Sequence, residues 1–216
     1  MASQRSGYYP PTEEKWNVYT HAFGLVMSCV GLIFLILRAN RLEGYVPLVS
    51  FSIFGASMIL LYAASTFYHS AKEEKIRYHL NILDHAAIFV LIAGTYTPFT
   101  LITLSGFTGW LIFGIVWGIA LLGIILKLFF TGRYRLLSTI IYVFMGTIIL
   151  FAIKPLTEKL PLNGLYWVLG GGVAYVLGAI LFSIRKIPFN HAIFHVMVLL
   201  GSFAHYMAIY HYVLPG

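Results

Sequence analysis

The sequence predicts an all-α integral membrane protein built as a bundle of seven transmembrane helices. Hydrophobic residues make up 60% of the chain and charged residues only 10%, whereas a soluble domain has about 25% charged residues. Mean hydropathy is +0.86. Seven apolar segments each approach the roughly 20 residues that a helix needs to cross a bilayer, and the short connections between them hold nearly all the charge.

Short connections leave no room for a second domain, so we expect one seven-helix domain over residues 1–216. The predicted spans are residues 18–37, 46–68, 82–104, 109–128, 136–153, 162–184 and 191–213. Residues 1–17 are expected to be a short cytoplasmic tail, and they lack the pattern of a cleaved signal. Cys29, the single cysteine, lies in the first span, which excludes an intramolecular disulfide and a cysteine-based zinc site.

Three of the later spans carry residues that affect helix shape or packing. Pro98 lies inside the third span and predicts a kink there. Glycines in the fourth and sixth spans favour close packing between helices; they are Gly114, Gly118 and Gly123, and Gly170, Gly171, Gly172 and Gly178.

The net charge of +7 fits a membrane protein better than a nucleic-acid-binding one, because almost no soluble surface is available for a basic patch. Taking alternate connections as lying on the same side, ten of the 14 Lys and Arg residues fall on the side of the N-terminus and four on the other. The positive-inside rule therefore predicts a cytoplasmic N-terminus and an external C-terminus. We expect a multi-pass protein of the plasma or inner membrane.

The unusual polar residues gather at one depth once this orientation is assigned. They lie at the inner ends of four spans: Glu14, Asn17 and His21 in the first, Ser65 and His69 in the second, Asp84 in the third, and His191 and His195 in the seventh. Ionisable side chains inside a membrane are costly and usually functional. The orientation was assigned from Lys and Arg alone, so this shared depth is an independent observation.

The spacing of these residues predicts a metal site. His191 and His195 are four residues apart and project from one helix face, as do Ser65 and His69. Three imidazoles with an open fourth position are typical of catalytic zinc, although imidazole also suits iron, copper and nickel. Asp84 would hold or deprotonate the water that the metal activates.

Each of these residues also has a plainer interpretation. A single His-x-x-x-His pair is common, and Asn190 would simply be the N-cap of the last helix. Asp84 would interact with a helix dipole, and Ser65 would bond to its own helix backbone. We expect His79 to be solvated, His85 to support the site from outside the ligand set, and His205 and His211 not to be ligands.

The spaced motifs resemble a known family. They are E-x-x-N-x-x-x-H at Glu14, Asn17 and His21, S-x-x-x-H at Ser65 and His69, L-D-H at Asp84, A-G-T-Y-T-P-F at residues 93–99, and H-x-x-x-H at His191 and His195. With them the chain resembles the hemolysin III type proteins of the progestin and adipoQ receptor family, which are related to alkaline ceramidases. The resemblance implies zinc held by His69, His191 and His195, with Asp84 bound through water and Ser65 nearby.

Two classes of function follow from this reading. The first is a zinc-dependent, ceramidase-like hydrolase of a lipid amide or ester bond, with Asp84 as base and Ser65 stabilising the water or the developing oxyanion. The second is a non-enzymatic receptor, lipid regulator or cytolytic factor with structural zinc. A transporter is disfavoured because no inverted repeat is present. The long soluble N-terminal region of the animal receptors is missing, so a hormone-binding role is not expected.

Overall fold

The computed structural model describes residues 9–130, 135–184 and 186–214. Its elements are α1 (Pro11–Ala39), α2 (Val46–Ser70), α3 (Glu74–Pro98), the π-helix η1 (Phe99–Thr103), α4 (Gly106–Phe130), α5 (Arg135–Thr147), the 3-10 helix η2 (Ile148–Ala152), α6 (Ile153–Lys159), α7 (Leu162–Ser183) and α8 (Asn190–Tyr212). Within this part of the chain they make seven spans long and apolar enough to cross a membrane. The predicted all-α, seven-span fold class is confirmed.

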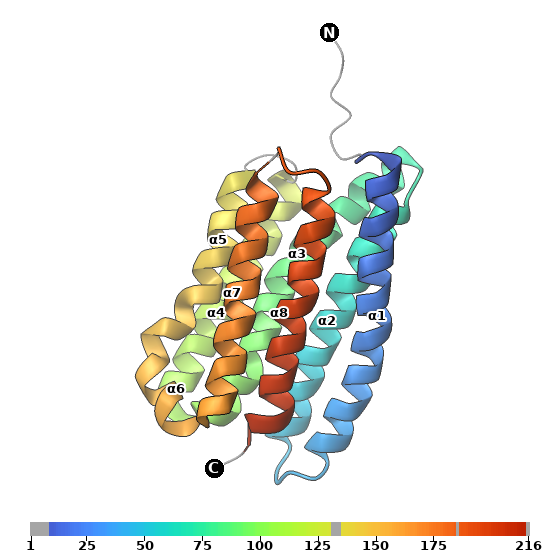
Figure 1. Ribbon diagram of the computed structural model, residues 1–216. Helices are drawn as coiled ribbons and strands as arrows, with labels where there is room; N and C mark the ends of the chain where they lie inside the picture. The colour runs from blue at the N-terminus through green and yellow to red at the C-terminus, as the bar shows by residue number, and fades with distance from the viewer. Residues whose placement is uncertain (1–8, 131–134, 185, 215–216) are drawn as a thin grey trace.

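The helices stand side by side in one bundle (Figure 1). The third span is central, since 78% of its most apolar stretch is buried against 50% or less for each other span. Large apolar side chains face outward from the surrounding helices, among them Phe23 at 61% and Leu122 at 64% exposure, as lipid-facing surfaces require. The start of α1 and the end of α8 lie at opposite ends of the bundle (Figure 1); which end faces the cytoplasm stays a prediction.

Two helices begin earlier than their hydropathy indicates. α1 starts at Pro11 and not at residue 18, because proline at the first helical position and acidic Glu13 and Glu14 in the first turn favour a helix start. α3 starts at Glu74 and not at residue 82. Polar first turns escape a search for apolar runs, and in both helices these turns carry side chains that reach the site.

The third and fifth spans change their helix type along their length. At Pro98 the α-helix gives way to the π-helical turn η1, at the place where the sequence predicted a kink. The fifth span runs through α5, η2 and α6 to Lys159, beyond the predicted end at residue 153. Pro155 lies in the first turn of α6, where its missing N–H is tolerated.

Packing against neighbouring helices explains only some of the glycines. A Cβ at Gly123, Gly171 or Gly178 would collide with a facing side chain: the rings of Phe89 and His205, and Met197, respectively. The packing interpretation is wrong for the others, Gly114, Gly118, Gly170 and Gly172, since a Cβ there would meet no atom of the described chain within 4 Å. Of these four, Gly114 and Gly170 are exposed, and Gly118 and Gly172 are half-buried.

Candidate metal centre

Three buried histidines from two helices meet at one end of the bundle. His69 lies in the last turn of α2, and His191 and His195 lie in the first two turns of α8. One ring nitrogen of each lies within 4.8 Å of the others. Nε2 of His191 is 3.1 Å from Nε2 of His69 and 3.1 Å from Nε2 of His195. The predicted histidines are thus brought together as a group able to hold a metal ion.

The other ring nitrogen of His69 faces a carboxylate. Its Nδ1 lies 2.6 Å from Oε2 of Glu14 in the first turn of α1. A carboxylate only accepts hydrogen bonds when ionised, so Nδ1 carries the proton and Nε2 keeps its lone pair. A histidine that ligates a metal almost always donates its second nitrogen in this way.

His195 is oriented by the same logic from the same helix. Its Nδ1 lies 3.2 Å from the backbone oxygen of Asn17 and 3.3 Å from the hydroxyl oxygen of Thr20. Thr20 gives its own proton to the backbone oxygen of Trp16 at 2.7 Å, so its hydroxyl oxygen is an acceptor toward His195. Nδ1 of His195 therefore carries the proton, and Nε2 faces the other two imidazoles with a lone pair.

These assignments test whether a metal fits. Nε2 of His191 lies 3.1 Å from two other Nε2 atoms, and it can donate a proton to only one of them. In at least one of these two pairs, therefore, two lone pairs face each other with no proton between them. A cation removes that conflict. Two nitrogens at about 2.0–2.1 Å from a tetrahedral zinc would be about 3.3 Å apart, close to the separations here. The donor set therefore fits a divalent metal with three imidazole ligands.

Helix α1 and Tyr9, which precedes it, also support the ligands through ring stacking and capping. His21, which is 3% exposed, stacks on His195 with ring centroids 3.5 Å apart and an interplanar angle of 11°. Tyr9 stacks on His191 at 4.5 Å. Oε1 of Glu13 accepts a hydrogen bond of 3.3 Å from the backbone N–H of His191, at the end of α8 where such groups lack intrahelical partners.

Ser65 is buried one turn from His69 on α2. Its hydroxyl has no hydrogen-bond partner among the residues that the structure describes, so it does not bond back to its own helix. Asn17 Oδ1 and both ring nitrogens of His21 are likewise buried without a partner in the described chain. Buried polar atoms of this kind usually meet a water, an ion or a ligand, and here they flank the histidines.

Asp84 is buried at 8% exposure but stands apart from the three-histidine group. Its Oδ2 lies 3.7 Å from Nδ1 of His85. Because α3 begins at Glu74, Asp84 lies ten residues into the helix, too far from its N-terminus for the dipole interpretation. It remains available as a group that acts through water.

The other histidines lie apart from the group. His85 is half-buried, with Nδ1 2.8 Å from the backbone oxygen of Asn81. His79 is exposed as expected, although on α3 and not in a loop. Nδ1 of His205 lies 2.8 Å from the backbone oxygen of Gly201, and its ring stacks on Tyr175 of α7. His211 is exposed in the last turn of α8.

The sequence interpretation was wrong about Asn190 and missed several contributors. The N-cap of α8 is Phe189 in a left-handed conformation (φ 56°), while Nδ2 of Asn190 donates to the backbone oxygen of Phe182 at 2.9 Å, in the last turn of α7. The missed residues are Tyr9, Glu13, Thr20 and Arg77. The repeat of polar residues along one face of α1 was a usable signal for Glu13 and Thr20; none marked Tyr9 or Arg77.

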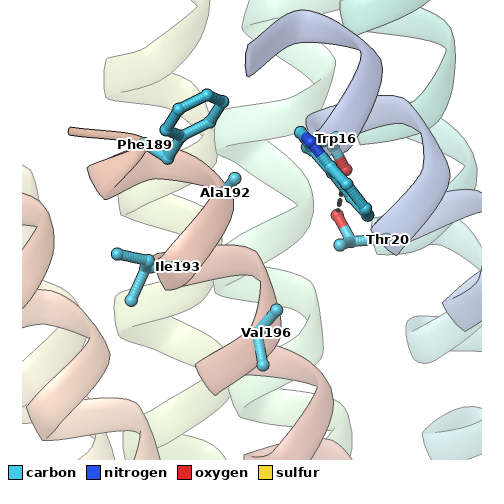
Figure 2. Close-up of a pocket in the computed structure, with 6 residues that line it drawn as sticks. All are labelled: Trp16, Thr20, Phe189, Ala192, Ile193 and Val196. Atoms are coloured by element: carbon cyan, nitrogen blue, oxygen red, sulfur yellow. Dashed lines mark hydrogen bonds between the residues drawn. The ribbon is translucent and has the colours of Figure 1, made fainter. Parts of the chain in front are cut away.

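An apolar groove of about 260 Å³ opens between α1 and α8 beside the histidines. Trp16 and Thr20 line it from α1. Ala192, Ile193 and Val196 line it from α8, and Phe189 lies just before that helix (Figure 2). Ala192 adjoins His191, and the Thr20 hydroxyl reaches His195. The groove thus runs along the outer surface of the bundle directly beside the ligand helices.

Comparison with known proteins assigns a family. The family model described as "Haemolysin-III related" matches residues 9–206. The chain belongs to this family. It is 47% identical to "Hemolysin-3" of Bacillus cereus, with 94% of this chain and 93% of the relative covered, and 46% identical to "Hemolysin-3 homolog" of Bacillus subtilis, with 93% and 94% covered. It is 29% identical to "Monocyte to macrophage differentiation factor" of Homo sapiens, with 96% and 88% covered. Membership confirms the resemblance that the sequence motifs indicated.

Proposed function

We propose that this Haemolysin-III related protein is a zinc-dependent hydrolase of a lipid amide or ester bond, acting in the cytoplasmic leaflet. The supporting observation is the convergence of three Nε2 atoms, together with the hold that α1 has on Nδ1 of His69 and of His195. Three imidazoles leave one coordination position open, which is the arrangement of catalytic zinc and not of structural zinc.

Each residue has a definite part in this proposal. His69, His191 and His195 hold the metal, which when bound polarises a carbonyl and makes a water more acidic. The carboxylate of Asp84 takes the proton from the attacking water, and the Ser65 hydroxyl donates a hydrogen bond to the substrate oxygen. Glu14, Asn17 and His21 keep the ligands oriented, and His85 lies beside the Asp84 carboxylate, with Nδ1 3.7 Å from Oδ2.

The groove between α1 and α8 supports a lipid as substrate. Its lining is apolar except for Thr20 and it faces outward from the bundle at the level of the histidines. An acyl chain in this groove would bring its polar linkage next to the metal ligands. A sphingolipid-like substrate would present an amide there, and a glycerolipid an ester.

The test combines metal content with lipid turnover in detergent-purified protein. Mass spectrometry should find about one zinc per chain in the wild type, and His191→Ala should lose it. Asp84→Ala should keep most of the metal and lose turnover of ceramide-like or ester lipids, while His79→Ala, the exposed histidine on α3, should match the wild type in both. Undiminished turnover in Asp84→Ala would remove the carboxylate from the mechanism.

A second candidate function rests on the names of two relatives, "Hemolysin-3" and "Hemolysin-3 homolog". Under it the chain is a cytolytic or regulatory membrane protein in which zinc only stabilises the fold. Lysis of erythrocytes by wild-type protein and equally by Asp84→Ala, with no lipid product in either, would favour this candidate. His191→Ala would then mainly lower thermal stability.

A further inference from the structure

The arrangement described so far leaves a buried guanidinium without a role. Arg77 lies in the first turn of α3 and is only 5% exposed, whereas Lys75, two residues earlier, is exposed. A buried charge is costly unless it is paired and hydrogen-bonded. The contacts of Arg77 therefore indicate what it is placed to do.

One end of the guanidinium holds the last turn of α2. Nη1 donates to the backbone oxygens of Tyr68 at 3.1 Å and of Ala71 at 3.3 Å. The last carbonyls of a helix lack intrahelical partners and attract cations. Cζ also lies 4.6 Å from the centre of the Tyr68 ring, a distance at which a cation is attracted to an aromatic face. Arg77 thus fixes the helix end that carries His69.

The other end of the guanidinium holds Glu14. Nη2 donates to Oε1 of Glu14, and the same oxygen accepts the backbone N–H of Tyr9 at 3.3 Å. The second carboxylate oxygen, Oε2, is the partner of His69 Nδ1 at 2.6 Å. The carboxylate is therefore held on one oxygen by Arg77 while its other oxygen orients the histidine.

We propose that Arg77 is a positioning residue of the metal centre, acting on His69 through Glu14 and through the end of α2. This inference rests on the metal binding assumed in the proposed function, but not on hydrolysis. The two routes converge on one ligand, so loss of Arg77 frees both the carboxylate and the backbone that set the direction of His69 Nε2. The planar fork of arginine serves both routes at once, which the single ammonium of lysine does not.

The test is a double-mutant cycle on zinc affinity, measured by chelator competition with the purified full chain. Arg77→Gln and Glu14→Gln should each weaken zinc binding about 10–100-fold, and Lys75→Gln should bind as the wild type does. If Arg77 acts through Glu14, the double variant should bind zinc much more tightly than expected from multiplying the fold-losses in affinity of the two single variants. Independent, multiplicative losses, or wild-type affinity in folded Arg77→Gln, would overturn the proposal.

A conservative variant keeps the test decisive if Arg77→Gln does not fold. Arg77→Lys retains the buried charge and should give a folded chain whose zinc affinity lies below that of the wild type. Wild-type affinity in Arg77→Lys would then overturn the proposal. Wild-type chain that binds no zinc would overturn both this inference and the proposed function, whereas zinc binding with the expected cycle but without lipid turnover would remove only the hydrolase.

Discussion

Whether a glycine of this protein can be replaced depends on the atoms that a side chain at that position would meet. Three consecutive glycines of α7 differ in this respect. Gly171 faces the His205 ring and the backbone oxygen of Gly201, 3.1 Å from where its Cβ would be. Gly170 and Gly172 face no atom of the described chain within 4 Å of that position. One turn of helix therefore contains a position that requires glycine and two that only tolerate it.

Gly171→Ala should destabilise the fold by about 1–3 kcal/mol because the methyl group must displace a buried ring. Gly170→Ala and Gly172→Ala should be neutral or stabilising by up to about 1 kcal/mol, since alanine favours a helix over glycine. Thermal unfolding in detergent, followed by circular dichroism, measures all three. A Gly171→Ala chain as stable as Gly172→Ala would contradict the close packing of α7 on α8.

The groove gives a second prediction for single side chains. Val196→Trp should fill the space between α1 and α8 and lower kcat/KM for a long-chain lipid at least tenfold. The control is Leu200→Trp, one turn further along α8 and 51% exposed outside the groove. Equal turnover of long-chain lipid by the two variants would mean that the acyl chain binds elsewhere.

Among the site residues, sequence reasoning could reach the histidines because spacing along one helix fixes which side chains share a face. It could also place Ser65 and Asp84 at the same depth. Arg77 escaped it because its partners are a backbone oxygen of Tyr68 on α2 and the carboxylate of Glu14 on α1. Such pairings depend on how helix ends meet in space, which local periodicity does not encode.

At the scale of elements, the break in the fifth span depends on one phenol from the third. The hydroxyl of Tyr96 donates toward the backbone oxygens of Met145 at 2.8 Å and Gly146 at 3.0 Å, and it accepts the N–H of Ile149 at 2.9 Å. These groups lie where α5 passes into η2. A break in a membrane helix needs partners for the freed backbone groups, and Tyr96 supplies them.

Tyr96→Phe should therefore cost about 1–3 kcal/mol, the penalty for leaving buried backbone groups without partners. Tyr166→Phe, whose side chain is 61% exposed on α7, should change stability by less than about 0.5 kcal/mol. Thermal or denaturant unfolding of both variants measures the difference. Pro98 predicted the break in the third span, but the break in the fifth span could not be predicted, because the hydroxyl that stabilises it belongs to another span.

At the scale of the whole molecule, sidedness is the prediction with the widest consequences. Glu43 lies exposed in the connection between α1 and α2, and Lys72 lies exposed between α2 and α3. In a Cys29→Ser background, Glu43→Cys should react with a membrane-impermeant maleimide in intact cells, and Lys72→Cys only after permeabilisation. The reverse labelling pattern would mean that the protein has the opposite orientation in the membrane, with the histidines near the outer surface.

The span count and the common depth of the polar residues could be read from the sequence. The reason is that hydropathy can be summed over each segment, and Lys and Arg can be counted in each connection, without knowing how the helices pack. Which helices are neighbours could not be read from the sequence, since a lipid-facing surface and a helix–helix interface are equally apolar. Two glycines of α4 illustrate this. Gly123 packs against the Phe89 ring, whereas a Cβ at Gly114 would meet no atom of the described chain within 4 Å.

The three candidate ligands come from helices that lie far apart in the chain, and this separation determines when the site can form during synthesis. His69 and His191 are 122 residues apart, so α1, α2 and α3, with the Arg77–Glu14 contact between α3 and α1, are synthesised long before α8 emerges. Until the last helix inserts, only one of the three imidazoles is present. If the three imidazoles hold a metal as proposed, a chain truncated before residue 191 would bind none, and metal loading would mark the completion of synthesis and insertion.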